Sequence, residues 1–128
     1  MRVLIILLLV TTSLASYGQK EINLKKKFFG KYKGEIPSYK MDTGDEIVDV
    51  GNTPIYIVIA KDQIAVRIGS NELTGTYDVM FEAKKYYLLD CKMQGQIATE
   101  RILVYKRGKR LSRDGMFPQP VAELNKYK

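Results

Sequence analysis

The chain has 128 residues, with 21 lysines and arginines against 14 aspartates and glutamates, a formal net charge of +7, no histidine and one cysteine. The absence of histidine excludes Ser-His-Asp and Cys-His catalysis and removes the usual imidazole ligands of zinc and copper. A single cysteine can form neither an internal disulfide nor a thiolate cage for a metal or an iron–sulfur cluster. No carboxylate pair, lysine or tyrosine stands out by its spacing, so we predict no catalytic residue, no metal site, no cofactor and no enzyme activity.

The N-terminal segment has the pattern of a secretory signal peptide. It reads MRVLIILLLVTTSLASYG, with one basic residue, an apolar run over residues 3–10, and small or polar residues before two plausible cleavage points, after Ala15 or after Gly18. A membrane-spanning helix would need about 20 predominantly apolar residues, and this run breaks at Thr11. We therefore predict a periplasmic or secreted protein, with a signal peptide over 1–18 and a mature chain over 19–128.

The mature chain is predicted to be one soluble domain. Cleavage after Gly18 leaves 110 residues (128 minus 18) and a charge of +6, because Arg2 is also removed. That length suits a single domain with a modest core. No cysteine follows the apolar run to carry a lipid anchor, so no stable membrane insertion is expected. Cys91, in the apolar segment YYLLDCKM, is expected to be buried.

The first clear pattern in the mature chain is the segment FFGKYKGEIPSY. As a strand, it places Gly30, Tyr32, Gly34 and Ile36 on one face and the charged residues between them on the other. A phosphate-binding loop is the alternative, but such a loop needs a helix directly after its glycines, and Pro37 follows here. We favour the strand, with the glycines as points of bending or close packing.

The next segment, MDTGDEIVDVGN, is the longest connection without a predicted strand, and it carries Asp42, Asp45, Glu46 and Asp49. The order of these carboxylates does not match the calcium loop of an EF-hand. A glycosidase would need two carboxylates held at a fixed separation, which the sequence does not supply. We predict a solvated acidic loop that partly balances the basic surface.

The segment from residue 55 to residue 107 shows short apolar runs that alternate with polar residues and are separated by turn residues at intervals of about ten, as in antiparallel strands. Two of these runs are LTGTYDVMFE and YYLLDCKM. The residues that share the apolar face are Leu73, Gly75, Tyr77, Val79 and Phe81 in the first run, and Tyr87, Leu89, Cys91 and Met93 in the second.

Two later segments are less clear. The strand around Arg101 points inward either with Ile97, Thr99, Arg101, Leu103 and Tyr105 or with Ala98, Glu100, Ile102 and Val104. Either choice buries a charge or exposes apolar surface. The final VAELNKYK, which opens after Pro120, has helical character but is barely two turns long.

Together these segments predict an all-β fold. Because almost no helix is available to cover the apolar face, a sheet of about six to eight strands must close into a barrel or fold over on itself as a tight sandwich. We therefore predict a small antiparallel up-and-down β-barrel with a short C-terminal helical segment.

The chain resembles the lipocalin-like, or calycin, barrels. Like them it is predicted to be exported, it carries a glycine-x-aromatic sequence in its first strand (Gly30-Lys31-Tyr32), and its strands run up and down before a short tail. Tyr32 stands where the family usually has tryptophan. Arg101 or Arg107 would be the basic residue that packs over this aromatic ring in the family.

The resemblance implies that a small apolar or amphipathic molecule binds inside the barrel. The candidate wall residues are Tyr32, Tyr77, Phe81 and Tyr87, because a tyrosine ring packs against a ligand while its hydroxyl bonds a polar group. In a small barrel, however, inward side chains can simply fill the interior. A ligand cavity and a filled core both remain open.

A second hypothesis relies on charge. The segment KRGKRLSR supplies Lys106, Arg107, Lys109 and Arg110 as candidate anion-binding residues, and LKKKFFGKYK adds lysines interleaved with aromatic rings. Such patches attract phosphate, anionic lipid headgroups and acidic polymers. Since export makes nucleic acid an unexpected partner, the alternative function is binding of an anionic polymer or lipid headgroup. A structural interaction protein that serves an exported partner is the third hypothesis.

Overall fold

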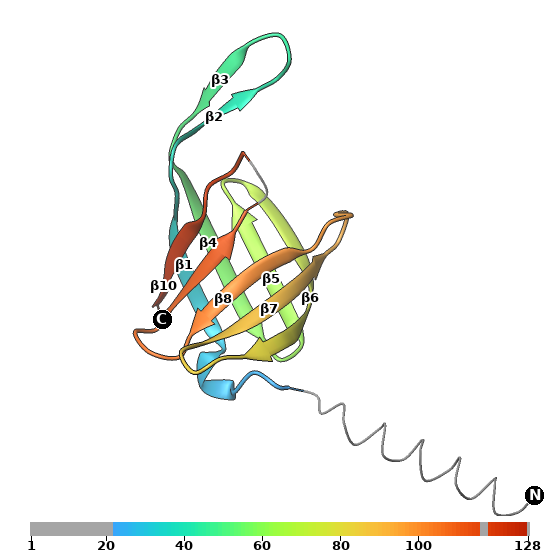
Figure 1. Cartoon of the computed structure of the whole chain (residues 1–128), viewed down its shortest axis with the longest axis vertical. Helices are drawn as coiled ribbons and strands as arrows, with labels where there is room; N and C mark the ends of the chain where they lie inside the picture. The colour runs from blue at the N-terminus through green and yellow to red at the C-terminus, as the bar shows by residue number, and fades with distance from the viewer. Residues whose placement is uncertain (1–21, 116–117, 128) are drawn as a thin grey trace, which may run out of the picture.

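The computed structural model describes residues 22–115 and 118–127, and in them eight antiparallel strands close into a barrel (Figure 1). The barrel strands are β1 (Gly30–Ile36), β4 (Thr53–Ala60), β5 (Gln63–Ile68), β6 (Asn71–Glu82), β7 (Tyr86–Met93), β8 (Glu100–Tyr105), β9 (Arg110–Asp114) and β10 (Ala122–Tyr127). Each strand pairs with the next barrel strand in the chain, and β10 returns to pair with β1. The prediction of a small up-and-down barrel is confirmed.

The inward faces of the strands form the core. In β1, Tyr32 and Ile36 are each only 1% exposed, whereas Lys31, Lys33 and Glu35 lie in solvent. This confirms the strand predicted for that segment. Similar alternation on the other strands fills the interior with aliphatic side chains, chiefly Ile55, Ile57, Ile59, Val66, Leu89, Ile102, Val104, Leu111 and Leu124.

Two glycines allow neighbouring strands to approach closely. A Cβ atom on Gly34 would collide with the backbone carbonyl of Glu123 on β10, and one on Gly75 would collide with the carbonyl of Lys92 on β7. Gly34 sits where the last strand closes against the first. The glycine between Tyr32 and Ile36 therefore serves close packing at the closure of the barrel.

One end of the barrel is covered by the 3₁₀ helix η1 (Lys26–Phe28), which precedes β1 (Figure 1). The Phe28 ring is buried and meets the Tyr87 ring edge to face at 5.3 Å. The Tyr32 hydroxyl donates a hydrogen bond of 2.8 Å to the Phe28 carbonyl, which ties η1 to the interior. Within the described residues, no helix has the length and apolar character needed to cross a membrane. The predicted signal peptide lies outside the described residues.

The ambiguity around Arg101 is resolved in favour of Glu100, Ile102 and Val104, which face inward while Arg101 is exposed. The buried charge has a partner on the next strand. Arg113 donates to both carboxylate oxygens of Glu100, at 2.8 and 3.2 Å, and donates a third bond to Gln119. A two-point, charge-assisted contact of this kind compensates the cost of burying both ions.

The predicted C-terminal helix is wrong, because its residues form strand β10. Ala122 and Leu124 point into the core and are almost wholly buried. β10 pairs with β9 on one side and with β1 on the other. An isolated helix of two turns is marginal in water, so two ladders of backbone hydrogen bonds and a buried apolar face outweigh the local preference.

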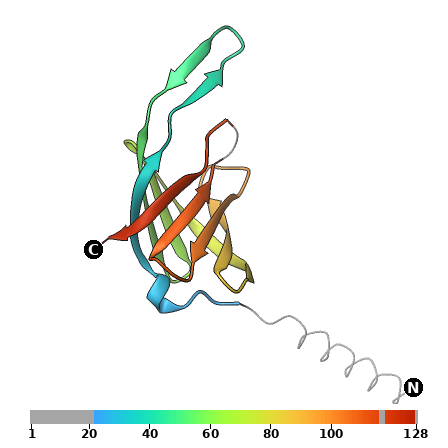
Figure 2. The ribbon, with the colours of Figure 1, turned by 60° about the vertical axis from the view of Figure 1, so that its left-hand side comes forward.

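The acidic segment is also more ordered than predicted. It forms a separate two-stranded ribbon of β2 (Tyr39–Asp42) and β3 (Ile47–Val50), which extends the β1–β4 hairpin away from the barrel (Figure 2). The acidic residues obscured an alternating pattern in which Tyr39 and Met41 pair with Val50 and Val48. The ribbon leaves the barrel at the end opposite η1.

Candidate anion-binding site

Three of the four residues predicted to line a ligand cavity are part of the packed interior. Tyr32 and Tyr87 are 1% exposed and Tyr77 is 8% exposed. The Tyr32 hydroxyl is bonded to Phe28, and the Tyr77 hydroxyl donates to the Ala60 carbonyl at 2.7 Å. Burial raises the pKa of Tyr32 to about 12 and also raises the pKa of Tyr77 and Tyr87. These rings fill the barrel, so their role toward a ligand stays a prediction.

The fourth residue, Phe81, does not share the inward face as predicted. A β-bulge between Val79 and Phe81 shifts the register of β6 against β7, so that Phe81 lies opposite Leu88. Because one extra residue in a strand reverses the alternation beyond it, Phe81 turns outward and is 43% exposed. Its ring packs against Tyr86 at a centroid distance of 6.0 Å.

One hollow in the described surface has a volume of about 1010 Å³ and lies between the segment that precedes β1 and the barrel wall. Tyr77 lines it together with Ile22, Asn23, Leu24, Phe29, Val79 and Met80, and two acidic and two basic side chains complete the lining. Of the four residues predicted to line a cavity, only Tyr77 lines this hollow.

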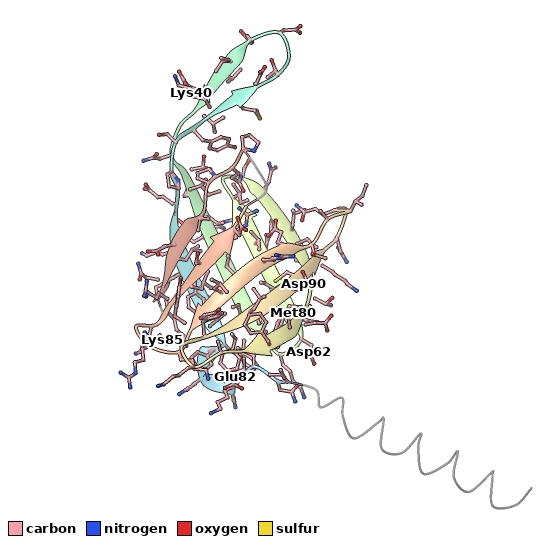
Figure 3. The ribbon with its side chains drawn as sticks, viewed as in Figure 1. Lys40, Asp62, Met80, Glu82, Lys85 and Asp90 are labelled. Carbon is pink, nitrogen blue, oxygen red and sulfur yellow. The ribbon has the colours of Figure 1, made fainter. Side chains whose placement is uncertain are left out.

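A second hollow, of about 660 Å³, brings the predicted basic residues together. The loop between β6 and β7 lies beside the loop between β8 and β9, because the Lys106 amide donates to the Lys85 carbonyl at 2.9 Å. Both loops are at the end of the barrel that η1 covers, where Figure 3 labels Lys85 and Glu82. The lining residues are Lys84, Lys85, Tyr86, Tyr105, Lys106, Arg107 and Arg110, and none of them is acidic.

Three of the four predicted anion-binding residues therefore line this hollow, and Lys109 does not. Lys109 lies in the same loop with a positive φ of 49°, and its carbonyl accepts a hydrogen bond from the Lys126 amide at 2.7 Å. The residues that the sequence missed are Lys84, Lys85, Tyr86 and Tyr105. A signal was present, because an up-and-down barrel places every second loop at the same end, and the two loops are separated by a single loop along the chain.

Some of the cations in the hollow are already engaged. Lys106 forms an ion pair with Glu82 at 2.5 Å and lies 5.0 Å from the centre of the Tyr87 ring. The hydrogen bond from Lys106 lowers the pKa of Glu82. The Arg110 guanidinium stacks over the Tyr105 ring at 4.2 Å and approaches Glu123 at 3.7 Å in an exposed pair. These contacts orient two of the basic groups against aromatic rings.

Other cations in the hollow have no such partner. Among the residues that the structure describes, Lys84, Lys85 and Arg107 have no carboxylate within ion-pair distance. Positive charges that converge without acidic neighbours raise the local potential and attract anions.

The positive charge continues around the hollow. Lysines 25–27 lie on and before η1, and Lys126 donates a hydrogen bond of 2.9 Å from its ammonium group to the Lys27 carbonyl. We call this surface the basic end. It comprises Lys25, Lys26, Lys27, Lys84, Lys85, Lys106, Arg107, Lys109, Arg110 and Lys126.

The remaining candidates from the sequence are Cys91, the acidic residues and the arginine expected to pack over Tyr32. Cys91 is wholly buried, as predicted, and burial raises the pKa of its thiol to about 12, so the thiol stays protonated near neutral pH. Within the described ranges, no three acidic, cysteine or histidine side chains are grouped so that they could hold a metal ion. Arg101 and Arg107 are exposed, and in the described structure neither stacks over the buried Tyr32 ring.

No protein-family model matches the chain, and neither a curated protein nor a solved structure is significantly similar to it. The closed eight-stranded antiparallel barrel is consistent with a calycin-like architecture. Function must therefore be inferred from the surface of this molecule itself.

Proposed function

We propose that the protein is an exported binding module, not an enzyme, and that its basic end binds an anionic ligand. The observation that carries this proposal is the 660 Å³ hollow, which is lined by five cationic side chains and two tyrosines from two neighbouring loops and the strand ends beside them, and by no acidic residue. The N-terminal sequence supports export. The filled interior favours this surface over a ligand site inside the barrel.

The ligand class that best fits the basic end is an anionic polymer. A single oxyanion would need only the few cations of the hollow, whereas the basic residues continue past it to η1 and to Lys126. Repeated charges along a polymer can engage such an extended surface. Tyr86 and Tyr105 offer ring faces and edges to the non-charged parts of the same ligand.

Neutralising two unpartnered cations is expected to weaken this binding. In the double variant Lys85→Gln/Arg107→Gln, the affinity for dextran sulfate should fall by up to about thirtyfold at low salt, since each exposed ion pair contributes up to about 1 kcal/mol. Isothermal titration calorimetry measures the change. Raising the salt concentration should also lower the affinity of the unaltered protein for dextran sulfate, because counterions screen exposed charges.

The matched control is Lys92→Gln/Arg101→Gln, which removes the same charge from two exposed strand positions away from the basic end. This control should bind dextran sulfate as the unaltered protein does, and neutral dextran should not bind. Equal weakening in both double variants would mean that only net charge matters and would overturn the site. Binding to phosphatidylglycerol vesicles without binding to dextran sulfate would assign the basic end to a membrane surface instead.

The hollow beside Tyr77 supports a second candidate function, the binding of a small amphipathic molecule of the kind implied by the calycin-like resemblance. Its lining combines apolar side chains with charges of both signs, and it adjoins the buried end of Tyr77. Native mass spectrometry of the purified protein tests this candidate. A mass adduct that survives gentle conditions and leaves on unfolding is expected, and a clean mass for protein incubated with a panel of fatty acids would reject it.

A further inference from the structure

The β2–β3 ribbon has an apolar face that is covered only at its base, where it meets the barrel. Directly paired residues of an antiparallel ladder share a face, so Tyr39, Met41, Val48 and Val50 lie on one side of the ribbon. Tyr39 packs against the core at the base of the ribbon, but Met41 is 37% exposed farther out. On the opposite side, Ile47 is 69% exposed.

The ribbon is nevertheless preformed. At its tip the Thr43 amide and hydroxyl both donate to the Glu46 carbonyl, at 3.0 and 3.1 Å, and the Gly44 amide donates to Asp42 at 2.8 Å. A two-stranded hairpin standing alone is at best marginally stable in water. An ordered, projecting ribbon with exposed apolar side chains is therefore suited to pack against another surface.

The charge on the ribbon indicates which surface that is. From residue 37 to residue 52 the chain has four carboxylates and Lys40 as its one basic residue. In the described structure Asp45 and Glu46 form no ion pair. The complementary surface is the basic end, which has unpartnered cations and, beside them, the exposed Phe81 ring packed against the half-buried Tyr86 ring.

We infer that the ribbon of one copy of the chain docks on the basic end of a second copy, so that copies associate head to tail. The ribbon does not reach its own basic end, because the seven residues of β1, at roughly 3.3 Å each, separate the two along the barrel. Figures 1 and 2 both show the ribbon and η1 at opposite ends. This inference rests on the proposed function to the extent that both use the cations of the same hollow, and it predicts that a polyanion competes with the contact.

The alternative form of self-association, ribbon against ribbon, is disfavoured by the same charges. A symmetric dimer through the apolar faces or free edges of two ribbons would bring two acidic tips close together, and like charges at short range repel. In the head-to-tail arrangement each acidic tip meets a basic surface instead. Such a contact does not close on itself, so assemblies should grow with protein concentration.

Charge reversal on each surface tests the inference. The ribbon variant is Asp45→Lys/Glu46→Lys, whose side chains form no described hydrogen bond, and the basic-end variant is Lys85→Glu/Arg107→Glu. Sedimentation velocity at low salt should show association that increases with concentration for the unaltered protein and its loss in each variant alone. Mixing the two variants should restore association, because the unaltered ribbon of the basic-end variant meets the unaltered basic end of the ribbon variant, and the two reversed surfaces are also complementary.

The matched controls Glu72→Lys and Lys92→Glu reverse exposed charges on the barrel strands and should leave association intact. Monomeric behaviour of the unaltered protein up to about 1 mM, or variants that fail to complement on mixing, would overturn the inference. Binding of dextran sulfate by a strictly monomeric protein would leave the proposed function standing alone. Association without dextran sulfate binding would support the head-to-tail contact and reject the polymer-binding function.

Discussion

Replacing Arg113 by methionine is expected to lower the free energy of unfolding by about 3–5 kcal/mol, which would make it one of the most destabilising single changes in the chain. The Glu100 carboxylate would remain buried on the inner face of β8 without the two hydrogen bonds that Arg113 now donates. An unpaired buried charge costs more than the lost attraction alone. Urea denaturation followed by circular dichroism measures the loss.

The double variant Arg113→Met/Glu100→Leu separates charge from packing. It removes both ions and fills their space with apolar atoms, so it should recover at least about 2 kcal/mol relative to Arg113→Met. Gln119 loses its partner in both proteins and is only partly buried, so it does not distinguish them. An equal loss in the single and the double variant would show that the arginine acts by its volume and not by balancing Glu100.

Replacing Gly34 by alanine is expected to cost about 3 kcal/mol or more, because the added methyl group collides with a backbone atom that cannot rotate away. That atom is the Glu123 carbonyl oxygen, at the seam where β10 pairs with β1. The seam should loosen before the rest of the barrel. Hydrogen exchange should therefore accelerate most in β10, and the urea midpoint should fall.

Gly51→Ala is the matched control for this change. No atom lies within 4 Å of a Cβ built on Gly51, and its φ is not in the left-handed region. Alanine there should leave stability unchanged or raise it slightly. If the two alanine variants unfold at the same urea concentration, the close approach of β10 to β1 is not the reason why glycine is needed at position 34.

The pairing of β10 with β1 also positions residues of the proposed anion-binding site. Lys126 belongs to β10, and Arg110 begins β9, which pairs with β10. Both residues are part of the basic end. Closure of the barrel by β10 thus brings cations from the end of the chain to the lysines of η1 near its beginning, as the bond from Lys126 to Lys27 shows.

The local pattern of apolar and polar residues was sufficient to predict much of the barrel. The two-residue alternation around Tyr32, Tyr77 and Tyr87 correctly predicted which side chains are buried, because a strand presents successive residues to opposite faces wherever one face meets the core. The absence of predicted helices long enough to cover a sheet left a barrel or a sandwich, and the structure has the closed barrel. The same periodicity failed at Phe81, since a bulge depends on the pairing with β7 and leaves no mark in the strand's own sequence.

Tertiary structure decided what depends on contacts between distant residues. VAELNKY has a weak local preference for helix, and only the presence of β1 and β9 on its two sides makes it a strand. Glu100 can be buried only because the register of β8 and β9 brings Arg113 beside it, which neither segment reveals alone.

The candidate site, too, could be predicted in part from the sequence, and the rest was decided by the tertiary structure. The basic residues of KRGKRLSR were visible in the sequence by composition, as were the acidic residues of the ribbon. Their arrangement in space was not visible in the sequence, because the hollow arises from the packing of two loops. The distance between the acidic ribbon and the basic end is set by the length of the barrel. The sequence by itself therefore determined the kinds of residue available for function, through local alternation and charge. Only the closure of the sheet decided which of them meet, because closure joins segments that are far apart in the chain.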